Sequence, residues 1–295
     1  MPVLQTCNRY RKILHSSPVY FDSNELLHTE LSPQLKWCVK NPFLNDYNQK
    51  EVYDIELKWF EWKENEMTRT YDVLLEYAQS DGTAVHLITK LFYPINMSLT
   101  CPNNELKRYG SSLDTGKLLC DIKQLKNDSC IIYSLGSNNE FDFEKSLAEQ
   151  THCQIYTFDC TSLPPKIPIH RLTFKKICLE NGIQQYMYPN QSSLGTKPSK
   201  RFEQILLDNK HEMLHVLKMD IEASEYSVFA DLFKNKIFPY QIAFESHWWH
   251  RDIYHAMLQQ QVFNQLWKTG YRFLQYAHNP GDQACVEWTL IRLYC

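Results

Sequence analysis

Between residues 106 and 295 the chain alternates short apolar runs with segments of helical periodicity, and this alternation restricts the fold more than any other feature. The predicted strands are Cys130–Leu135, Gln154–Phe158, Arg171–Leu179, Leu214–Met219, Tyr240–Phe244, Tyr271–Tyr276 and Val286–Leu293. The predicted helices are Asp142–Gln150, Ser199–Asn209, Glu222–Phe233 and Asp252–Thr269. We therefore expect an α/β fold with a mostly parallel seven-stranded sheet, one antiparallel strand near an edge, and helices on both faces.

The first part of the chain, residues 1–105, is less regular. Tyr71–Ala78 and Ala84–Phe92 have helical patterns, whereas "LKWFEWKE" at 57–64 alternates like a strand. We interpret residues 1–105 as a cap that packs on the main domain, residues 106–295, and not as an independent domain.

The composition limits the kinds of partner. The formal net charge is −3 at pH 7, so no basic field favours nucleic acid. No apolar run reaches the roughly 18 residues of a membrane-spanning helix, and the first residues lack the apolar centre of a signal peptide. Three N-x-S sequons, at Asn96, Asn127 and Asn190, weigh little because such triplets often arise by chance. We expect neither nucleic-acid binding nor a membrane span.

The ten cysteines form no C-x-x-C pair, which argues against a zinc or redox motif. Cys130, Cys153 and Cys178 lie in apolar runs, where an unpaired cysteine behaves as a small hydrophobic residue. These observations favour a reduced, cytoplasmic chain, and a secreted or membrane-tethered form stays open as the alternative.

A turn after the first predicted strand, S-L-G-S-N at 134–138, is a candidate cofactor loop. Gly136 permits a tight turn and close approach of the backbone to a ligand, and the next helix adds the positive end of its dipole. Asp159 closes the next strand, 23 residues after Gly136, where an acid can hold ribose hydroxyls. Each residue alone is more often a plain turn or cap residue, but together they favour a nucleoside-type cofactor.

Two later strands also end in polar side chains. Asp220 follows the fourth strand and can position a substrate or a cofactor amine, whereas Glu222 fits equally well an acidic first helical turn. Glu245 and His247 follow the fifth strand beside two tryptophans, which is typical of a substrate pocket. His247 is a candidate general base because imidazole titrates near neutral pH, although a surface histidine beside loop aromatics is about as common.

The segment from His211 to His215 fits the H-E-x-x-H pattern of zinc proteases. That chemistry needs both histidines on one face of a continuous helix. Here the next residues begin a buried strand, and no third ligand follows at a suitable spacing. We therefore treat the match as accidental and predict no metal site.

Several segments, in this order, resemble the FkbM-related methyltransferase-domain proteins: "LDTGKLLCD", "IIYSLGSNNEFDFEKSLA", "IYTFDC", "VLKMDIEASEYSVF" and "IAFESHWW". The resemblance covers about residues 106–295, and its most specific parts are the S-x-G-S-N turn and the K-x-D-I-E strand end. It departs from the family at Ser134, where an acid is frequent, at Asn138-Asn139, where a further glycine is common, and at Ala223-Ser224, where Gly-Ala is usual.

The resemblance implies a Rossmann-like class I methyltransferase fold that uses S-adenosylmethionine. Gly136, Ser137 and Asn138 would then lie by the methionine moiety, Asp159 would bind the ribose, and Asp220 would border the site of methyl transfer. The cofactor-binding residues expected on this basis are Ser134, Gly136, Ser137, Asn138, Asp159 and Asp220. The expected catalytic residues are Asp220, Glu245 and His247.

The leading functional hypothesis is a methyltransferase that acts on a hydroxyl, carboxyl or amine of a small molecule, glycan or protein. Methyl transfer is an in-line displacement, so the protein mainly aligns the reactants and removes a proton. A catalytically inactive binding module on the same fold is the main alternative. A dinucleotide-dependent oxidoreductase is disfavoured because the turn lacks G-x-G-x-x-G.

Overall fold

The central element is a seven-stranded sheet with the order β10-β11-β9-β8-β3-β4-β5. A computed structural model describes residues 38, 40–44, 47, 99–111, 116–126, 129–179, 198–222, 224–247, 253–279 and 285–295. The strands of the sheet are β3 (Ile131–Leu135), β4 (Gln154–Phe158), β5 (Leu172–Lys175), β8 (Val216–Met219), β9 (Gln241–His247), β10 (Tyr271–His278) and β11 (Cys285–Arg292). Only β11 pairs antiparallel with its neighbours β9 and β10. The predicted mostly parallel sheet with one antiparallel strand is confirmed.

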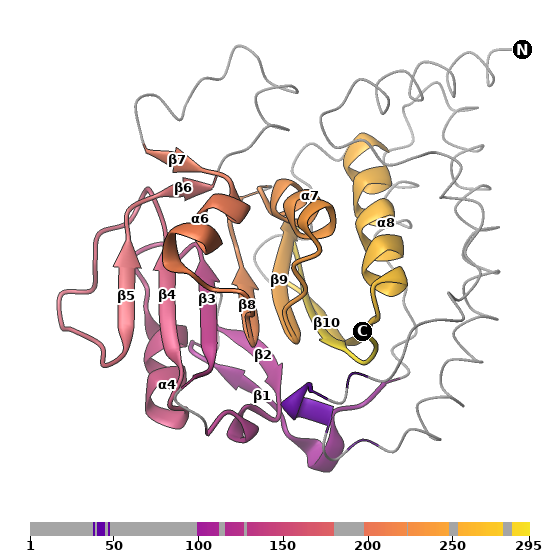
Figure 1. Ribbon diagram of the computed structural model, residues 1–295, viewed down its shortest axis with the longest axis horizontal. Helices are drawn as coiled ribbons and strands as arrows, with labels where there is room; N and C mark the ends of the chain where they lie inside the picture. The colour runs from indigo at the N-terminus through magenta and orange to yellow at the C-terminus, as the bar shows by residue number, and fades with distance from the viewer. Residues whose placement is uncertain are drawn as a thin grey trace, which may run out of the picture.

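Helices cover both faces, as predicted. The main helices are α4 (Asp142–Gln150), α6 (Phe202–Asn209), α7 (Glu225–Asn235) and α8 (Ile253–Lys268). Apolar side chains of α6, α7 and α8 pack into one core cluster against one face, while those of α4 pack on the opposite face. Figure 1 shows α6, α7 and α8 ranged across one side of the sheet. Each fully buried Leu or Phe in these layers contributes roughly 1.5–3 kcal/mol.

The face that carries α4 is completed by an antiparallel pair, β1 (Leu106–Tyr109) and β2 (Lys117–Cys120), which the sequence analysis did not predict. Three short 3-10 helices, η1 (Pro42–Leu44), η2 (Pro102–Asn104) and η3 (Ile122–Gln124), accompany this pair. Gln241 of β9 joins β2 to the sheet because its side chain hydrogen-bonds both the N–H and the carbonyl of Cys120. This contact places the start of β2, and with it Lys117, over the middle of the sheet.

The third predicted strand, Arg171–Leu179, is corrected to two shorter strands. β5 joins the sheet beside β4, whereas β6 (Cys178–Leu179) leaves it and pairs parallel with β7 (Ser199–Lys200). The β5 register ends at Lys175, so the chain turns away over residues 176 and 177. The predicted helix at 199–209 accordingly begins later, after β7.

The prediction of unpaired cysteines is wrong. Among the described cysteines, four disulfides join Cys38 to Cys295, Cys101 to Cys120, Cys130 to Cys153, and Cys160 to Cys178. The residues of each pair are distant in sequence, so the apolar runs gave no sign of their pairing. Disulfides of this number are typical of oxidising compartments, and they remove the reason for favouring a reduced chain.

The predicted helices and strand between residues 57 and 92 lie outside the described residues. Within the described part of the chain, no helix is long and apolar enough to cross a membrane.

Candidate active site

The turn after β3 lies at the point where the strand order reverses, between β3 and β8. Gly136 has φ of +81°, and a Cβ atom added there would lie 1.8 Å from the carbonyl oxygen of Asp220. Only glycine fits so close to the backbone of the neighbouring strand end. The N–H of Gly136 also donates to the Phe158 carbonyl (3.0 Å), so the turn is fixed on both sides.

Asn138 and Asn139 also have positive φ angles, 48° and 61°. Asparagine is one of the few residues besides glycine that adopt this left-handed conformation readily. This explains physically why asparagine can stand where a further glycine is common.

Asp159 lies at the end of β4, and its carboxylate accepts seven hydrogen bonds. Oδ2 accepts from the Ser137 N–H (2.8 Å), the Asn138 N–H (3.0 Å) and two hydroxyls, those of Ser137 and Ser162. Oδ1 accepts from Thr161 and from the Ser162 N–H. Burial favours the neutral acid, but the hydrogen bonds, led by that from Ser162, outweigh it and lower the pKa of Asp159. The ionised carboxylate ties the turn after β3 to the turn after β4.

Asp220 lies at the end of β8, next to the buried ammonium group of Lys117. Lys117 Nζ is 2.9 Å from Asp220 Oδ2 and 3.8 Å from Glu245 Oε2, and it also donates a hydrogen bond to Glu287. Its side chain is 1% exposed. Burial would lower the pKa of Lys117, but Asp220, Glu287 and Glu245 outweigh it and raise the pKa. One ammonium group therefore holds carboxylates from three strands.

Glu287 belongs to this cluster because β11 runs antiparallel to β9 and pairs Glu287 directly with Glu245. Burial raises the pKa of Glu287 to about 7, against the effect of Lys117 and in the same direction as the charge of Glu245. Burial and the nearby charge of Asp220 also raise the pKa of Glu245. The two carboxyl groups therefore hold protons more strongly than ordinary glutamates do.

His247 lies on the other side of Asp220. Its Nδ1 is 3.0 Å from Glu225 Oε1, and its Nε2 is 3.4 Å from Glu222 Oε2 and 3.8 Å from Asp220 Oδ1. Burial alone would lower the pKa of His247, but Glu225, Asp220 and Glu245 outweigh it and raise the pKa to about 10. At neutral pH the ring is an imidazolium ion, which is a poor general base.

Two cavities flank the junction of Gly136 and Asp220. One, of about 210 Å³, is lined by Phe158, Asp159 and Cys160 on one side and by Ile177, Cys178, Leu179 and Ile221 on the other. The second, of about 50 Å³, is polar and includes Glu144 and Lys218. Of the residues that the sequence assigned to the site, Gly136, Asn138 and Asp220 line both cavities.

Three predicted site residues, Ser134, Glu245 and His247, line neither of these two cavities. Ser134 is fully buried within β3 and lines neither of them. Glu245 and His247 are also buried. His247 contacts Asp220 directly, and Glu245 is linked to Asp220 through Lys117. Asp159 and Ser137 each line one of the cavities.

Sequence reasoning missed Lys117, Glu287 and Glu144. The predicted site residues follow the carboxyl ends of parallel strands. Glu287 lies near the beginning of the antiparallel strand β11, which meets the same edge of the sheet. Lys117 is part of the quoted segment "LDTGKLLCD", and that was its one sequence signal. Glu144 follows the turn in "FDFE", and its Oε2 accepts no hydrogen bond from the described residues although it is buried. Burial raises its pKa.

The H-E-x-x-H segment is not helical. α6 ends at Asn209, and residues 211–214 have no regular structure. His211 Nδ1 is 2.8 Å from the Tyr133 hydroxyl, while His215 Nδ1 accepts the N–H of Ile131. The two rings serve different parts of the fold, as expected for an accidental match.

Carboxylate and imidazole atoms of Asp220, Glu222 and His247, and of Asp220, Glu245 and Glu287, are close enough together to hold a metal ion. Lys117 already places a cation among the second group. The imidazolium of His247 does the same for the first. The absence of a metal site stays a prediction.

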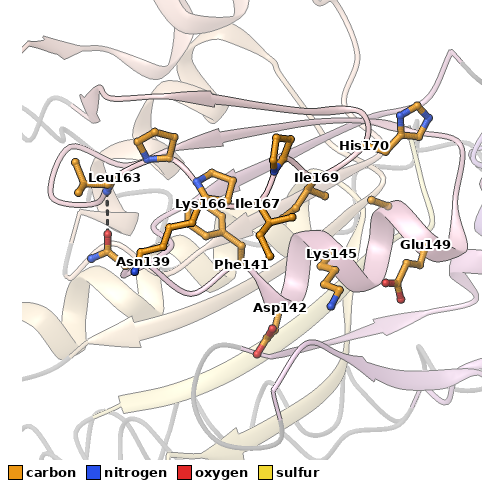
Figure 2. Close-up of a pocket in the computed structure, with 14 residues that line it drawn as sticks. Asn139, Phe141, Asp142, Lys145, Glu149, Leu163, Lys166, Ile167, Ile169 and His170 are labelled. Carbon is orange, nitrogen blue, oxygen red and sulfur yellow. Dashed lines mark hydrogen bonds between the residues drawn. The ribbon is translucent and has the colours of Figure 1, made fainter.

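A surface groove of about 830 Å³ lies between α4 and the proline-rich loop 163–170. Figure 2 shows Asn139 and Leu163 at one end of it, joined by a hydrogen bond, and His170 at the other. The carboxylates and cations described above are not among its lining residues.

Comparison with known protein families gives one match over most of the chain. The family described as "Methyltransferase domain" matches residues 53–292 of the chain. No curated protein matches it. A putative rRNA methylase from Clostridium thermocellum is similar in structure. The matched region covers 58% of this chain and 91% of the methylase, with a TM-score of 0.33 and 7% identity. Fibrillarin of Aeropyrum pernix, solved with bound S-adenosyl-L-methionine, covers 57% of this chain and 68% of its own (TM-score 0.30, 11% identity). A putative S-adenosylmethionine-dependent methyltransferase from Streptococcus mutans covers 63% and 55% (TM-score 0.32, 13% identity).

Proposed function

The chain belongs to the methyltransferase domain family, and from this premise we propose that it transfers a methyl group from S-adenosylmethionine to an acceptor at the junction of Gly136 and Asp220. The observation that carries the proposal is the contact between these two residues at the point where the strand order reverses, with a cavity on either side.

The described residues fit the two ends of this cofactor. Phe158, Ile177 and Leu179 give the larger cavity the apolar walls that suit a flat nucleoside base. Glu144, whose buried Oε2 accepts no hydrogen bond from the part of the chain that the structure describes, gives the smaller cavity an acceptor for an ammonium group. When bound, the cofactor supplies an electrophilic methyl group on a positively charged sulfur.

The cofactor-binding roles of Ser137, Asn138, Asp159 and Asp220 are part of this proposal. Asp159 contacts ribose hydroxyls only if one of its side-chain donors, such as Thr161, gives up its hydrogen bond. Its bonds to the backbone of Ser137 and Asn138 keep the turn in place in either case. Ser134 supports the turn from within β3 and makes no direct contact in this account.

A hydroxyl or amine acceptor loses a proton when it is methylated, and we assign Glu287 as the group that takes this proton. Its raised pKa of about 7 suits a proton acceptor near neutral pH. His247, predicted as a general base, is assigned instead to positioning, because its imidazolium and the ammonium of Lys117 hold Asp220 from opposite sides. Glu245 and Glu287 are both paired with the ammonium group of Lys117.

The acceptor remains a hydroxyl, carboxyl or amine of a small molecule, a glycan or a protein. The net charge of −3 argues against nucleic acid. The narrower assignment to the FkbM-related group rests on the quoted motifs alone. The four disulfides support an oxidising compartment for this chain in place of the cytoplasm.

The domain boundary at residue 105 also stays a prediction. Packing of Phe43, Leu44 and Leu99 in the same core cluster as α4, together with the Cys38–Cys295 disulfide, supports a first segment that is not independent.

Titration calorimetry with S-adenosylmethionine and S-adenosylhomocysteine tests the proposal. Binding of both is expected, and transfer of a labelled methyl group to a component of a cell extract would exclude the inactive binding module. Absence of binding by either compound contradicts the proposed function.

A further inference from the structure

The larger cavity beside Gly136 has a disulfide in its wall. Cys160, directly after Asp159, and Cys178, the first residue of β6, both line the cavity and are joined to each other. Their Cα atoms are 4.7 Å apart. The remaining disulfides involve no residue that lines this cavity.

The disulfide joins two segments just beyond the last hydrogen bond between the β4 and β5 sides, which runs from the Asp159 N–H to the Lys175 carbonyl (3.2 Å). β6 pairs with β7 and not with the main sheet, and the turn at 159–162 lies beyond the end of β4. Ile177 and Leu179 supply apolar walls from the β6 side, while Phe158 supplies one from the β4 side. The covalent bond between Cys160 and Cys178 fixes the spacing of these walls.

We propose that the Cys160–Cys178 disulfide is a positioning element of the nucleoside pocket, so that the protein binds its cofactor tightly only in the oxidised form. This inference rests on the proposed function. It extends that function by making cofactor affinity depend on the redox state of one bond.

The reaction that switches the pocket is an ordinary thiol–disulfide exchange. A dithiol reductant supplies two electrons and two protons, the Cys160–Cys178 bond breaks to two thiols, and the reductant becomes a disulfide. Without the bond, the nearest link between the two sides is the backbone hydrogen bond from the Asp159 N–H to the Lys175 carbonyl (3.2 Å), three residues before Cys178, and we expect the pocket walls to loosen.

The chain offers a matched control. Cys130 and Cys153 precede β3 and β4, at the opposite edge of the sheet from the cavity. The two disulfides close loops of similar length, with sequence separations of 23 and 18. Loss of either should therefore lower the melting temperature to a similar degree.

The experiment measures S-adenosylhomocysteine affinity by calorimetry on the full oxidised chain and two double variants. C160A/C178A is expected to bind at least tenfold more weakly, and C130A/C153A within twofold of the parent. Equal affinities for the two variants would overturn the inference. If the oxidised parent itself does not bind, the proposed function fails and this inference with it.

A second measurement does not depend on the folding of a variant. The parent is treated with dithiothreitol with and without saturating S-adenosylhomocysteine, and the opened cysteines are alkylated and identified by mass spectrometry. Because coupling is reciprocal at equilibrium, bound ligand should lower several-fold the fraction of Cys160–Cys178 that is reduced and leave that of Cys130–Cys153 unchanged. Protection of both pairs alike, or of neither, would contradict the inference.

Discussion

The two ends of the candidate site stabilise their carboxylates with different groups, hydrogen-bond donors at one end and cations at the other. At the nucleoside end, one carboxylate, Asp159, receives seven hydrogen bonds from the protein and is ionised. At the other end, the carboxylates of Asp220, Glu245 and Glu287 converge on the single ammonium group of Lys117. The first end stabilises one charge with neutral donors, whereas the second stabilises several charges with cations, those of Lys117, His247 and Lys218.

This difference explains why the same residue type has different roles. Neutral donors stabilise the charge of Asp159 without adding one, so its carboxylate serves as a fixed link between two turns. Around Lys117, burial and the neighbouring charge of Glu245 raise the pKa of Glu287 to about 7. A site that holds a removable proton near pH 7 is suited to proton transfer.

The largest effect is expected from K117M. Removing the ammonium leaves three partly buried carboxylates without their cation, which should cost about 4 kcal/mol of unfolding free energy. Denaturant titration measures it. K123M serves as the control, because Lys123 is half-exposed and pairs with Glu105 at the surface. The double variant K117M/E287Q should recover part of the loss; no recovery would argue against a charge-driven cluster.

Gly136 separates the two ends, and G136A should disturb both. The added Cβ would lie 1.8 Å from the Asp220 carbonyl oxygen, so the expected cost is about 3 kcal/mol, with loss of S-adenosylhomocysteine binding. G270A is the control. Gly270 also has positive φ and a backbone oxygen, that of Tyr294, 2.0 Å from an added Cβ, but it lies after α8. The folded fraction of G270A should bind S-adenosylhomocysteine with the affinity of the parent protein.

D159N tests the nucleoside end. An amide has one acceptor oxygen where the carboxylate has two, so several of the seven hydrogen bonds are lost and the stability should fall by about 2 kcal/mol. Thermal unfolding measures the change. D142N, at an exposed position in the first turn of α4, is expected to change little. Equal melting temperatures for the two variants would mean that Asp159 does not hold the turns.

The smallest expected effect is a pH dependence. The pKa of His247 rises from 6.5 to about 10 on folding, so its contribution to stability is complete below pH 6.5 and is lost as the pH rises towards 10. The raised pKa of Glu287 acts in the same direction, with loss as the pH rises through about 7. Stability should therefore fall by about 1 kcal/mol per pH unit between pH 7 and 8. In H247Q the slope should be smaller; an unchanged slope would assign it to other groups.

The fold was predictable from sequence because the periodicity of each strand and helix is local. The strands that bear Gly136, Asp159 and Asp220 were recognised, and so was the closing antiparallel pair. What failed depends on distant partners. The strand predicted at 171–179 is divided because β6 pairs with β7, and the four disulfides join cysteines whose neighbours in sequence resemble ordinary core residues.

Within the site, sequence reasoning could name the carboxylates but not their donors. The role of His247 as a general base stays a prediction, and Glu225 and Asp220, which outweigh burial and raise its pKa, lie far from it in sequence. Lys117 comes from a strand that packs across the sheet, and Glu287 from the one strand that runs the other way. Neither position can be derived from spacing along the chain.

A crystal structure of the full, oxidised chain with S-adenosylhomocysteine tests the central claim most directly. The account predicts ligand density across the two cavities at Gly136 and Asp220, with the nucleoside base between Phe158 and Leu179 and the sulfur facing Asp220. Density in the groove of Figure 2 instead, or none at a concentration that saturates other methyltransferases, would contradict it.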